Sequence, residues 1–264
     1  MNQNEKRLNL LFVGNSFTDD TSQYVPDIAL SYGYKEMTVA HLFIGACSVN
    51  MHLKNIREGA STYYCTVDHG CGWKAFPNYS VKEAAALCDW DAVVTMDGTG
   101  DGSKKTDPES FVNLPALVSE LKNIAGDGAR YVFNMSWVGE STYRHPEIVL
   151  FDGDVSLMYE KIALVMRDTV GKMPEIDIIS PTGTAIQNAR SSSYEGRFTR
   201  DGYHLDRCCG RFIAALTLFC SVTGEDPANV GFFPHGMSEK MKKIAIESVK
   251  NAISEPYKVT PSIN

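Results

Sequence analysis

The chain has 264 residues, of which 44% are hydrophobic and 22% charged, a composition typical of a globular protein that buries a substantial core. Its formal net charge of -7 argues against a nucleic-acid groove and against an anionic membrane patch, because both need clustered lysines and arginines. We therefore expect a small-molecule or neutral partner, no nucleic acid and no membrane contact.

Five short runs of apolar and β-branched residues have the length of buried strands, and helical patterns lie between and after them. The predicted strands are 8–13, 37–44, 91–96, 129–136 and 176–180, and the predicted helices are 22–32, 80–88, 109–125, 153–170, 205–223 and 238–253. This alternation predicts an α/β protein, a three-layer α/β/α sandwich around a parallel sheet. Because no repeat or linker divides the chain, we expect a single domain over residues 1–264, with 50–79 as an irregular insertion over the sheet's edge.

The cysteines and the N-terminal segment bear on the compartment. Seven cysteines is an odd number, and Cys208 and Cys209 are adjacent, which suits free thiols in a reducing compartment. The segment MNQNEKRLNLLFVG has only about five apolar residues in a row, too few for a signal peptide or a membrane span. We expect a cytoplasmic protein, or a periplasmic or extracellular one if an export signal was removed. The oligomeric state is not predicted.

The first predicted strand runs directly into a polar turn in LLFVGNSFTDD, residues 10–20. The carboxyl ends of parallel strands are where open α/β sheets bind their ligands. Ser16 therefore stands where a nucleophile could act, although a serine at a strand end is also a common helix N-cap.

A second polar group lies near the end of the chain in FTRDGYHLD, residues 198–206, where Asp201 and His204 are three apart. An aspartate can fix the tautomer of a histidine that takes a proton from a serine. Alternatively, Asp201 caps the turn and His204 is a surface histidine.

Together, LLFVGNSFTDD, HLFIGACSV, WDAVVTMDGTG, PTGTAIQNAR and FTRDGYHLD resemble successive landmarks of the SGNH, or GDSL-like, hydrolase superfamily, and of a bacterial branch of it whose substrates are largely uncharacterised. The resemblance spans residues 10–206. It implies a flavodoxin-like fold with a five-stranded parallel sheet and a serine esterase that needs no cofactor. It also implies that Ser16 is the nucleophile, His204 the base and Asp201 the orienting acid, and that the N–H groups of Ser16 and Gly45 hold the oxyanion.

One landmark departs from the family's pattern. The superfamily usually has an Asn after the third strand, and this branch a Gln, whose amide donates a further hydrogen bond to the oxyanion; here the sequence is TMDGTG. Asp97 or Gly98 occupies that place, and an ionised carboxylate cannot donate. Since losing such a donor costs on the order of 10²–10³ in turnover, the chain is either slower than its relatives, or uses Thr99 or a backbone N–H, or has lost the activity. Asp97 could also be only a turn residue.

The resemblance suggests a short-chain ester as substrate, such as an O-acetyl group on a carbohydrate. A second hypothesis is a catalytically weak or silent carbohydrate-binding protein on the same fold. Gln187, Asn188 and Arg190 follow the fifth strand and could hold sugar hydroxyls or a substrate carboxylate; equally, they could cap helices and bind the loop that carries Asp201.

One cluster of possible metal ligands and one single cysteine suggest other chemistry only weakly. Cys65, Asp68, His69 and Cys71 are possible metal ligands, but their spacing is no established zinc pattern, so we predict no metal site. Cys47, two residues after Gly45, has no second histidine to serve it and is predicted to be a small buried residue.

Overall fold

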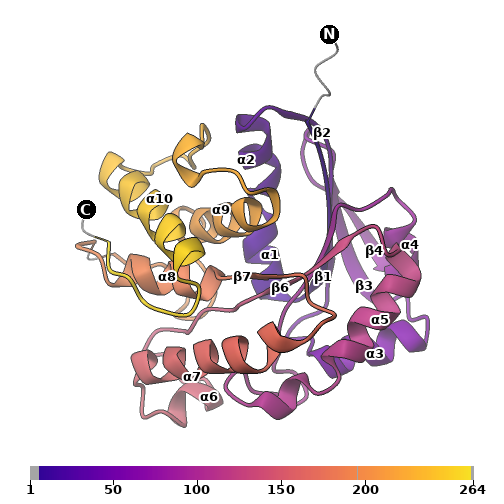
Figure 1. Ribbon diagram of the computed structural model, residues 1–264, viewed down its shortest axis with the longest axis horizontal. Helices are drawn as coiled ribbons and strands as arrows, with labels where there is room; N and C mark the ends of the chain where they lie inside the picture. The colour runs from indigo at the N-terminus through magenta and orange to yellow at the C-terminus, as the bar shows by residue number, and fades with distance from the viewer. Residues whose placement is uncertain (1–5, 195, 263–264) are drawn as a thin grey trace.

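The computed structural model describes residues 6–194 and 196–262. Its centre is one seven-stranded sheet in the order β4-β3-β2-β1-β5-β6-β7 (Figure 1). The strands are β1 (Lys6–Gly14), β2 (Tyr34–Phe43), β3 (Tyr63–Asp68), β4 (Lys74–Tyr79), β5 (Ala92–Thr95), β6 (Arg130–Asn134) and β7 (Ile178–Ser180).

Five of these strands are parallel and correspond to the five apolar runs of the sequence. Their order, β2-β1-β5-β6-β7, is the flavodoxin-like order. The predicted number of five strands is wrong, because β3 pairs antiparallel with β2 and β4 pairs antiparallel with β3. Both extra strands come from residues 50–79, which we expected to be irregular; Tyr63, Cys65 and Val67 are buried in alternation along β3, as a strand of this kind requires.

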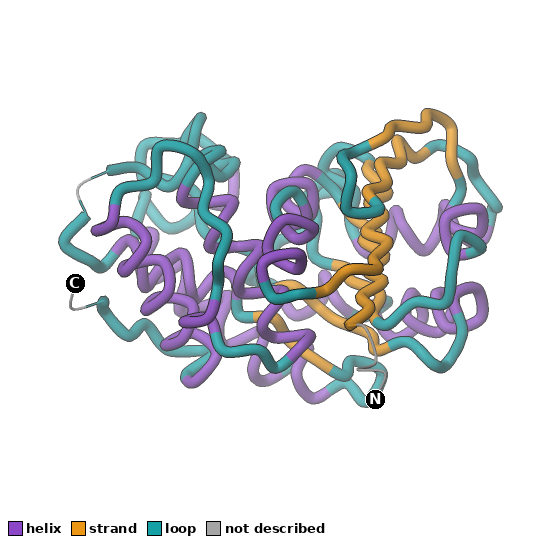
Figure 2. The backbone as a smooth tube through the Cα atoms, turned by 90° about the horizontal axis from the view of Figure 1, so that it is seen from above, coloured by secondary structure: helices purple, strands orange, loops and turns teal. Residues whose placement is uncertain are grey.

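Helices cover both faces of the sheet (Figures 1 and 2). One apolar core contains residues from α1, α2, α8, α9 and α10, and the other contains residues from α3, α4, α5, α6 and α7. The helices are α1 (Ser16–Ser22), α2 (Val25–Ser31), α3 (Val49–Arg57), α4 (Val81–Ala85), α5 (Leu114–Ala125), α6 (Pro146–Val149), α7 (Val155–Asp168), α8 (Thr182–Arg190), α9 (Cys209–Thr223) and α10 (Glu239–Ser254), with 3-10 turns at Pro108–Phe111, Val170–Lys172 and Pro227–Asn229. No helix of the described residues is both long and apolar enough to cross a membrane.

The helix predicted over 22–32 corresponds to α2, and a further helix that was not predicted, α1, precedes it. Helix α1 begins at Ser16, immediately after β1, and α2 carries Pro26 in its first turn, where proline is tolerated because its missing N–H would have no intrahelical partner.

The sheet register aligns the ends of three neighbouring strands. Gly14 at the end of β1 pairs with Phe43 at the end of β2, and Val13 pairs with Thr95 at the end of β5. From β1 the chain crosses over to β2 on one side, while β5 and the strands after it lie on the other, so the carboxyl end of β1 is the switch point where such sheets bind ligands.

Candidate active site

Ser16 is the first residue of α1, and the helix cap is its neighbour Asn15. The Asn15 Oδ1 atom accepts a hydrogen bond from the Phe17 N–H at 3.0 Å, and the Thr18 side chain bonds back to the Asn15 N–H, which completes a capping box. The alternative that Ser16 is itself the N-cap is therefore wrong. Its hydroxyl is not used for capping, and its N–H, at the N1 position, has no intrahelical acceptor.

The amide nitrogen of the Asn15 side chain connects the segments that follow β1, β2 and β5. This Nδ2 atom donates to the carbonyl oxygens of Cys47 at 3.1 Å and Asp97 at 2.8 Å, which follow β2 and β5. Sequence analysis did not identify this residue as functional. The feature of the sequence that indicates its role is the position of an amide side chain at the end of a buried strand, where it can both donate and accept hydrogen bonds.

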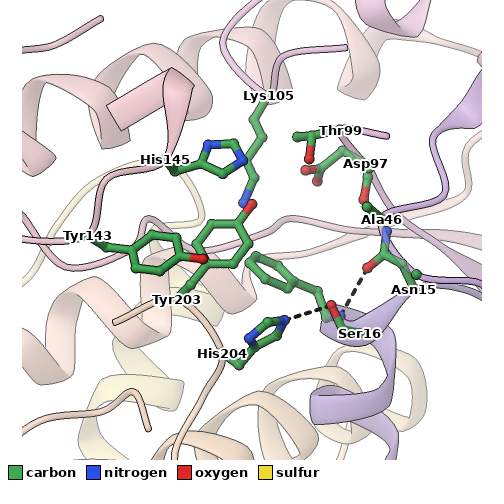
Figure 3. Close-up of a pocket in the computed structure, with 13 residues that line it drawn as sticks. Asn15, Ser16, Ala46, Asp97, Thr99, Lys105, Tyr143, His145, Tyr203 and His204 are labelled. Carbon is green, nitrogen blue, oxygen red and sulfur yellow. Dashed lines mark hydrogen bonds between the residues drawn. The ribbon is translucent and has the colours of Figure 1, made fainter. Parts of the chain in front are cut away.

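Ser16, His204 and Asp201 are brought together in one chain of hydrogen bonds. His204 Nε2 lies 2.9 Å from Ser16 Oγ, and His204 Nδ1 lies 2.7 Å from Asp201 Oδ2 (Figure 3). Burial raises the pKa of the Asp201 carboxyl, but hydrogen bonds from the His204 ring and from the N–H groups of His204 and Tyr203 outweigh it, so the pKa lies below its usual value. An ionised Asp201 can therefore orient the imidazole.

The turn that carries Asp201 and His204 is anchored to α1 by Asp20, a fully buried carboxylate four residues after Ser16. Asp20 Oδ2 accepts the Leu205 N–H at 2.8 Å, and Oδ1 accepts from Arg200 Nη1 and Arg211 Nε, each at 2.8 Å. These are charge-assisted hydrogen bonds, which are stronger than neutral ones. They connect the segment that carries Ser16 directly to the segment that carries His204.

A second anchor for the same turn comes from the loop after β6. Trp137 Nε1 donates to the Tyr203 carbonyl at 2.8 Å, and the Glu140 N–H donates to the Gly202 carbonyl at 2.6 Å. The Glu140 carboxylate also accepts from the Thr199 hydroxyl at 2.8 Å.

Gln187, Asn188 and Arg190 are not among the residues that line the cavity at Ser16. Arg190 donates to the Val138 carbonyl at 2.7 Å and lies 3.5 Å from a Glu140 carboxylate oxygen. It therefore supports the loop after β6, which in turn anchors the turn that carries Asp201 and His204. The Asn188 side chain binds the backbone of Ser248 and Thr260. Gln187 lines a different cavity, beside Tyr257. The expectation that these residues contact a substrate bound at Ser16 is corrected accordingly: Asn188 and Arg190 bind neighbouring segments of the chain, and Gln187 lines another cavity.

A cavity of about 460 Å³ opens above Ser16 (Figure 3). The residues that line it are Asn15, Ser16, Phe17, Gly45, Ala46, Asp97, Gly98, Thr99, Lys105, Tyr143, His145, Tyr203 and His204. The predicted triad serine and histidine and all the predicted oxyanion candidates are included. A Cβ placed on Gly45 would meet no atom within 4 Å, so this glycine leaves open space on the cavity wall.

The loops that follow β2 and β5 pack tightly at this wall. A Cβ on Gly98 would lie 1.9 Å from the Cys47 carbonyl oxygen, so no other residue fits there without a shift. The Gly100 N–H donates to the Ala46 carbonyl at 2.8 Å, and Ala46 itself has a φ of 53°, a left-handed conformation that is unusual for alanine. Gly98 is thus required by packing.

Asp97 is buried, with 6% of its surface exposed, and Ser136 Oγ lies 3.1 Å from its Oδ2. Burial raises the pKa of the Asp97 carboxyl, while Lys105 and the hydrogen bond from Ser136 partly oppose that rise. In Figure 3 the Asp97 carboxylate points toward Thr99 and Lys105 rather than toward Ser16. Asp97 is therefore a buried residue and not an exposed one at the turn, and its carboxylate is not directed at Ser16.

The cysteines that could suggest a metal site or a thiol nucleophile have other surroundings in the structure. Asp68 accepts the N–H groups of Gly70, Cys71 and Gly72, and no group of three potential ligands that could hold a metal ion occurs among the described residues. Burial raises the pKa of the Cys47 thiol to about 12, which disfavours a nucleophilic thiolate.

The strand order, with Ser16 at the switch point of the sheet, defines an α/β protein of flavodoxin-like topology, as the sequence resemblance to SGNH, or GDSL-like, hydrolases implies. Residues 9–252 match the family described as "Domain of unknown function (DUF4886)", and the chain belongs to this family. This agrees with the sequence resemblance to a largely uncharacterised branch of the SGNH superfamily, and the solved structures described next confirm the likeness of fold.

Solved structures agree with this assignment. A DUF4886 family protein from Bacteroides uniformis ATCC 8492 is 29% identical, with a TM-score of 0.89 over 97% of this chain and 98% of that one. Axe2, an acetylxylan esterase from Geobacillus stearothermophilus, is 15% identical, with a TM-score of 0.53 over 83% of this chain and 95% of that one. TesA is 14% identical, with a TM-score of 0.50 over 82% and 98%. The last two show likeness of fold only. No curated protein matches the sequence.

Proposed function

We propose that this protein is a serine esterase that hydrolyses short-chain acyl esters through an acyl-enzyme. The observation that carries the proposal is the hydrogen-bonded sequence from Ser16 Oγ to His204 Nε2 at 2.9 Å and from His204 Nδ1 to Asp201 at 2.7 Å, at the floor of a cavity. This is the arrangement of nucleophile, base and orienting acid that acyl transfer requires.

In the proposed reaction, His204 Nε2 takes the Ser16 proton while Ser16 Oγ bonds to the ester carbonyl carbon. The N–H groups of Ser16 and Gly45 stabilise the negative charge that develops on the carbonyl oxygen. His204 then gives its proton to the alcohol oxygen, the carbon–oxygen bond breaks and the alcohol leaves. A water molecule repeats the sequence on the acyl-enzyme, releasing the carboxylic acid and restoring Ser16.

We further propose an O-acetyl group on a carbohydrate as the substrate. In support, Axe2, a protein of similar fold, is an acetylxylan esterase. A catalytically silent carbohydrate-binding protein is the second candidate, because Asp97 stands where the superfamily has an amide donor.

Replacing Ser16 by alanine tests the proposal. We expect Ser16→Ala to lower the rate of p-nitrophenyl acetate hydrolysis by on the order of 10³-fold or more, because the nucleophile is lost, and to block labelling by a serine-directed fluorophosphonate. His204→Ala should also lose hydrolysis, because no base remains for the Ser16 proton. Both rates and the labelling are measured on folded protein.

The matched control is Ser22→Ala, in the same helix but outside the cavity lining, which should keep both hydrolysis and labelling. If Ser16→Ala hydrolysed as fast as the parent protein, the nucleophile would lie elsewhere. If the parent protein neither hydrolysed esters nor reacted with the label, the silent binding protein would be the better description.

A further inference from the structure

Lys105 is a charged residue in an unusual place. Only 2% of its surface is exposed, yet it lines the cavity above Ser16. Its Nζ donates to the Trp137 carbonyl at 3.2 Å and lies 4.1 Å from the centre of the Phe17 ring and 5.0 Å from that of Tyr203. Buried lysines are normally paired with a carboxylate, but within the described part of the chain Lys105 makes no ion pair. An ammonium group with three N–H donors thus has donor capacity left.

Figure 3 shows where that capacity is directed. The Lys105 ammonium and the Asp97 carboxylate point toward the same part of the cavity, with the Tyr203 and Thr99 hydroxyls beside them, and Ser16 lines the same cavity. This part of the cavity therefore offers both hydrogen-bond donors and acceptors.

The charges nearby indicate what such a wall can bind. Besides Asp97, the buried Glu147 contacts Thr106, the residue after Lys105: its Oε1 accepts the N–H and the hydroxyl of Thr106 at 3.0 and 2.9 Å, and its Oε2 has no hydrogen-bond partner among the described residues. Because Asp97 lines the same cavity as Lys105 and Glu147 is bonded to the next residue, this part of the wall offers no excess of positive charge for an anionic ligand. A neutral group that both donates and accepts fits better, and neighbouring hydroxyls do so.

We propose that Lys105 and Asp97 form a subsite that binds neighbouring hydroxyl groups on the alcohol half of a sugar ester, Lys105 donating and Asp97 accepting. The inference rests on the proposed esterase function. Apart from the carbonyl oxygen that Ser16 and Gly45 would hold, an acetyl group has no atom that hydrogen-bonds strongly, so the polar wall recognises the alcohol. Lys105 is then a residue that determines specificity.

The test compares a methyl glucopyranoside carrying one acetyl group with its monodeoxy analogues, each lacking one hydroxyl. In the parent protein, removing the hydroxyl that Lys105 binds should lower kcat/KM by about 10- to 100-fold, the usual effect of a hydrogen bond to a charged group. In Lys105→Met the same removal should change kcat/KM by less than about 2-fold, because the partner is gone. A merely structural role of Lys105 would not produce this coupling.

Lys104→Met, at the exposed neighbouring lysine, is the matched control and should behave as the parent protein does. Should Lys105→Met fail to fold, Lys105→Gln carries the same comparison. The inference is overturned if the deoxy analogues and the full sugar ester react alike in the parent protein, or if the loss is the same in Lys105→Met. Faster hydrolysis of an acetylated uronic acid than of the neutral sugar would overturn it too, in favour of an anion site.

The two proposals can fail separately. If the protein hydrolyses p-nitrophenyl acetate but not the sugar acetates, the proposed subsite is wrong and the proposed esterase activity stands. If no ester is hydrolysed, the subsite is tested by measuring the binding of methyl glucopyranoside with saturation-transfer NMR. Binding by the parent protein that is lost in Lys105→Met supports the subsite. No binding by the parent protein overturns it.

Discussion

At the level of single residues, Asp97 is where the chain differs most from the pattern that its sequence resembles. A carboxylate aimed at the oxyanion would oppose the charge that develops there, and its replacement by an amide would raise turnover. The buried Asp97 side chain lies instead beside Lys105 and Ser136. Its effect should therefore appear in the binding of the alcohol half of the ester.

We expect Asp97→Asn to lower kcat/KM for the monoacetylated glucoside by about 5- to 10-fold, because an amide is a weaker acceptor for a sugar hydroxyl than a carboxylate is. The change should appear mainly in KM. Asp101→Asn, in the same loop and exposed, is the control. A rise of about 10-fold in kcat on p-nitrophenyl acetate would contradict this and restore an oxyanion role for position 97.

Ser16, Asp201 and His204 could be predicted because the motifs that contain them together resemble those of the SGNH superfamily, whereas each segment alone also allows a helix cap or a surface residue. The sequence could not predict the cavity wall. Lys105 is buried only because Phe17 and Tyr203, which are far from it in the sequence, cover its side chain. A lysine in a polar loop is ordinarily exposed, so nothing local indicates that this one faces the site.

At the level of elements, the position of the turn that carries Asp201 and His204 depends on α1. Asp20 connects the two through the Leu205 N–H and two arginines, and it is completely buried. Removing one partner of a buried ion pair is costly because the remaining charges are left uncompensated.

We expect Asp20→Asn to lower the free energy of unfolding by about 3 kcal/mol and to lower kcat on p-nitrophenyl acetate by about 10-fold or more, since a turn displaced by 1 Å misplaces His204. Urea denaturation and steady-state kinetics measure the two effects. Asp27→Asn, at an exposed aspartate of α2, should change neither. Loss of kcat at unaltered stability would mean that Asp20 takes part in the chemistry rather than holding the turn.

Strand periodicity accounts for what could be predicted of the elements. The five parallel strands are nearly continuous apolar runs, which are conspicuous in a sequence. By contrast, β3 has only a partial alternation and β4 is largely exposed, with Pro77 within it. Strands of this kind at and next to the edge of a sheet depend on pairing with a neighbour more than on their own composition, and so the sequence of residues 50–79 does not predict them.

At the level of the whole molecule, two buried histidines make stability depend on pH. Burial lowers the pKa of both His41 and His52 to about 3, whereas an unfolded histidine titrates near 6.5. Between these values the unfolded chain binds a proton at each position and the folded protein does not, so the free energy of unfolding decreases as the pH falls below about 6.5.

We expect a decrease of about 2 kcal/mol per histidine between pH 7 and pH 5. His52→Gln, away from the cavity, should remove about half of the difference between urea denaturation curves at the two pH values. His69→Gln, at an exposed histidine, should leave that difference as it is. If His52→Gln left the pH dependence unaltered, His52 would already be charged in the folded protein.

The anchoring of α1 by Asp20 has a consequence for the order in which a growing chain can fold. Ser16 and His204 are 188 residues apart, so at typical rates of synthesis the ribosome adds His204 on the order of 10 to 40 s after Ser16. During that interval β1 and α1 exist without Arg200 and Arg211, and the Asp20 carboxylate cannot be buried at acceptable cost. We therefore expect the first strand-helix unit to remain solvated until the last quarter of the chain emerges, and nascent chains that end before residue 200 to expose α1 to proteases.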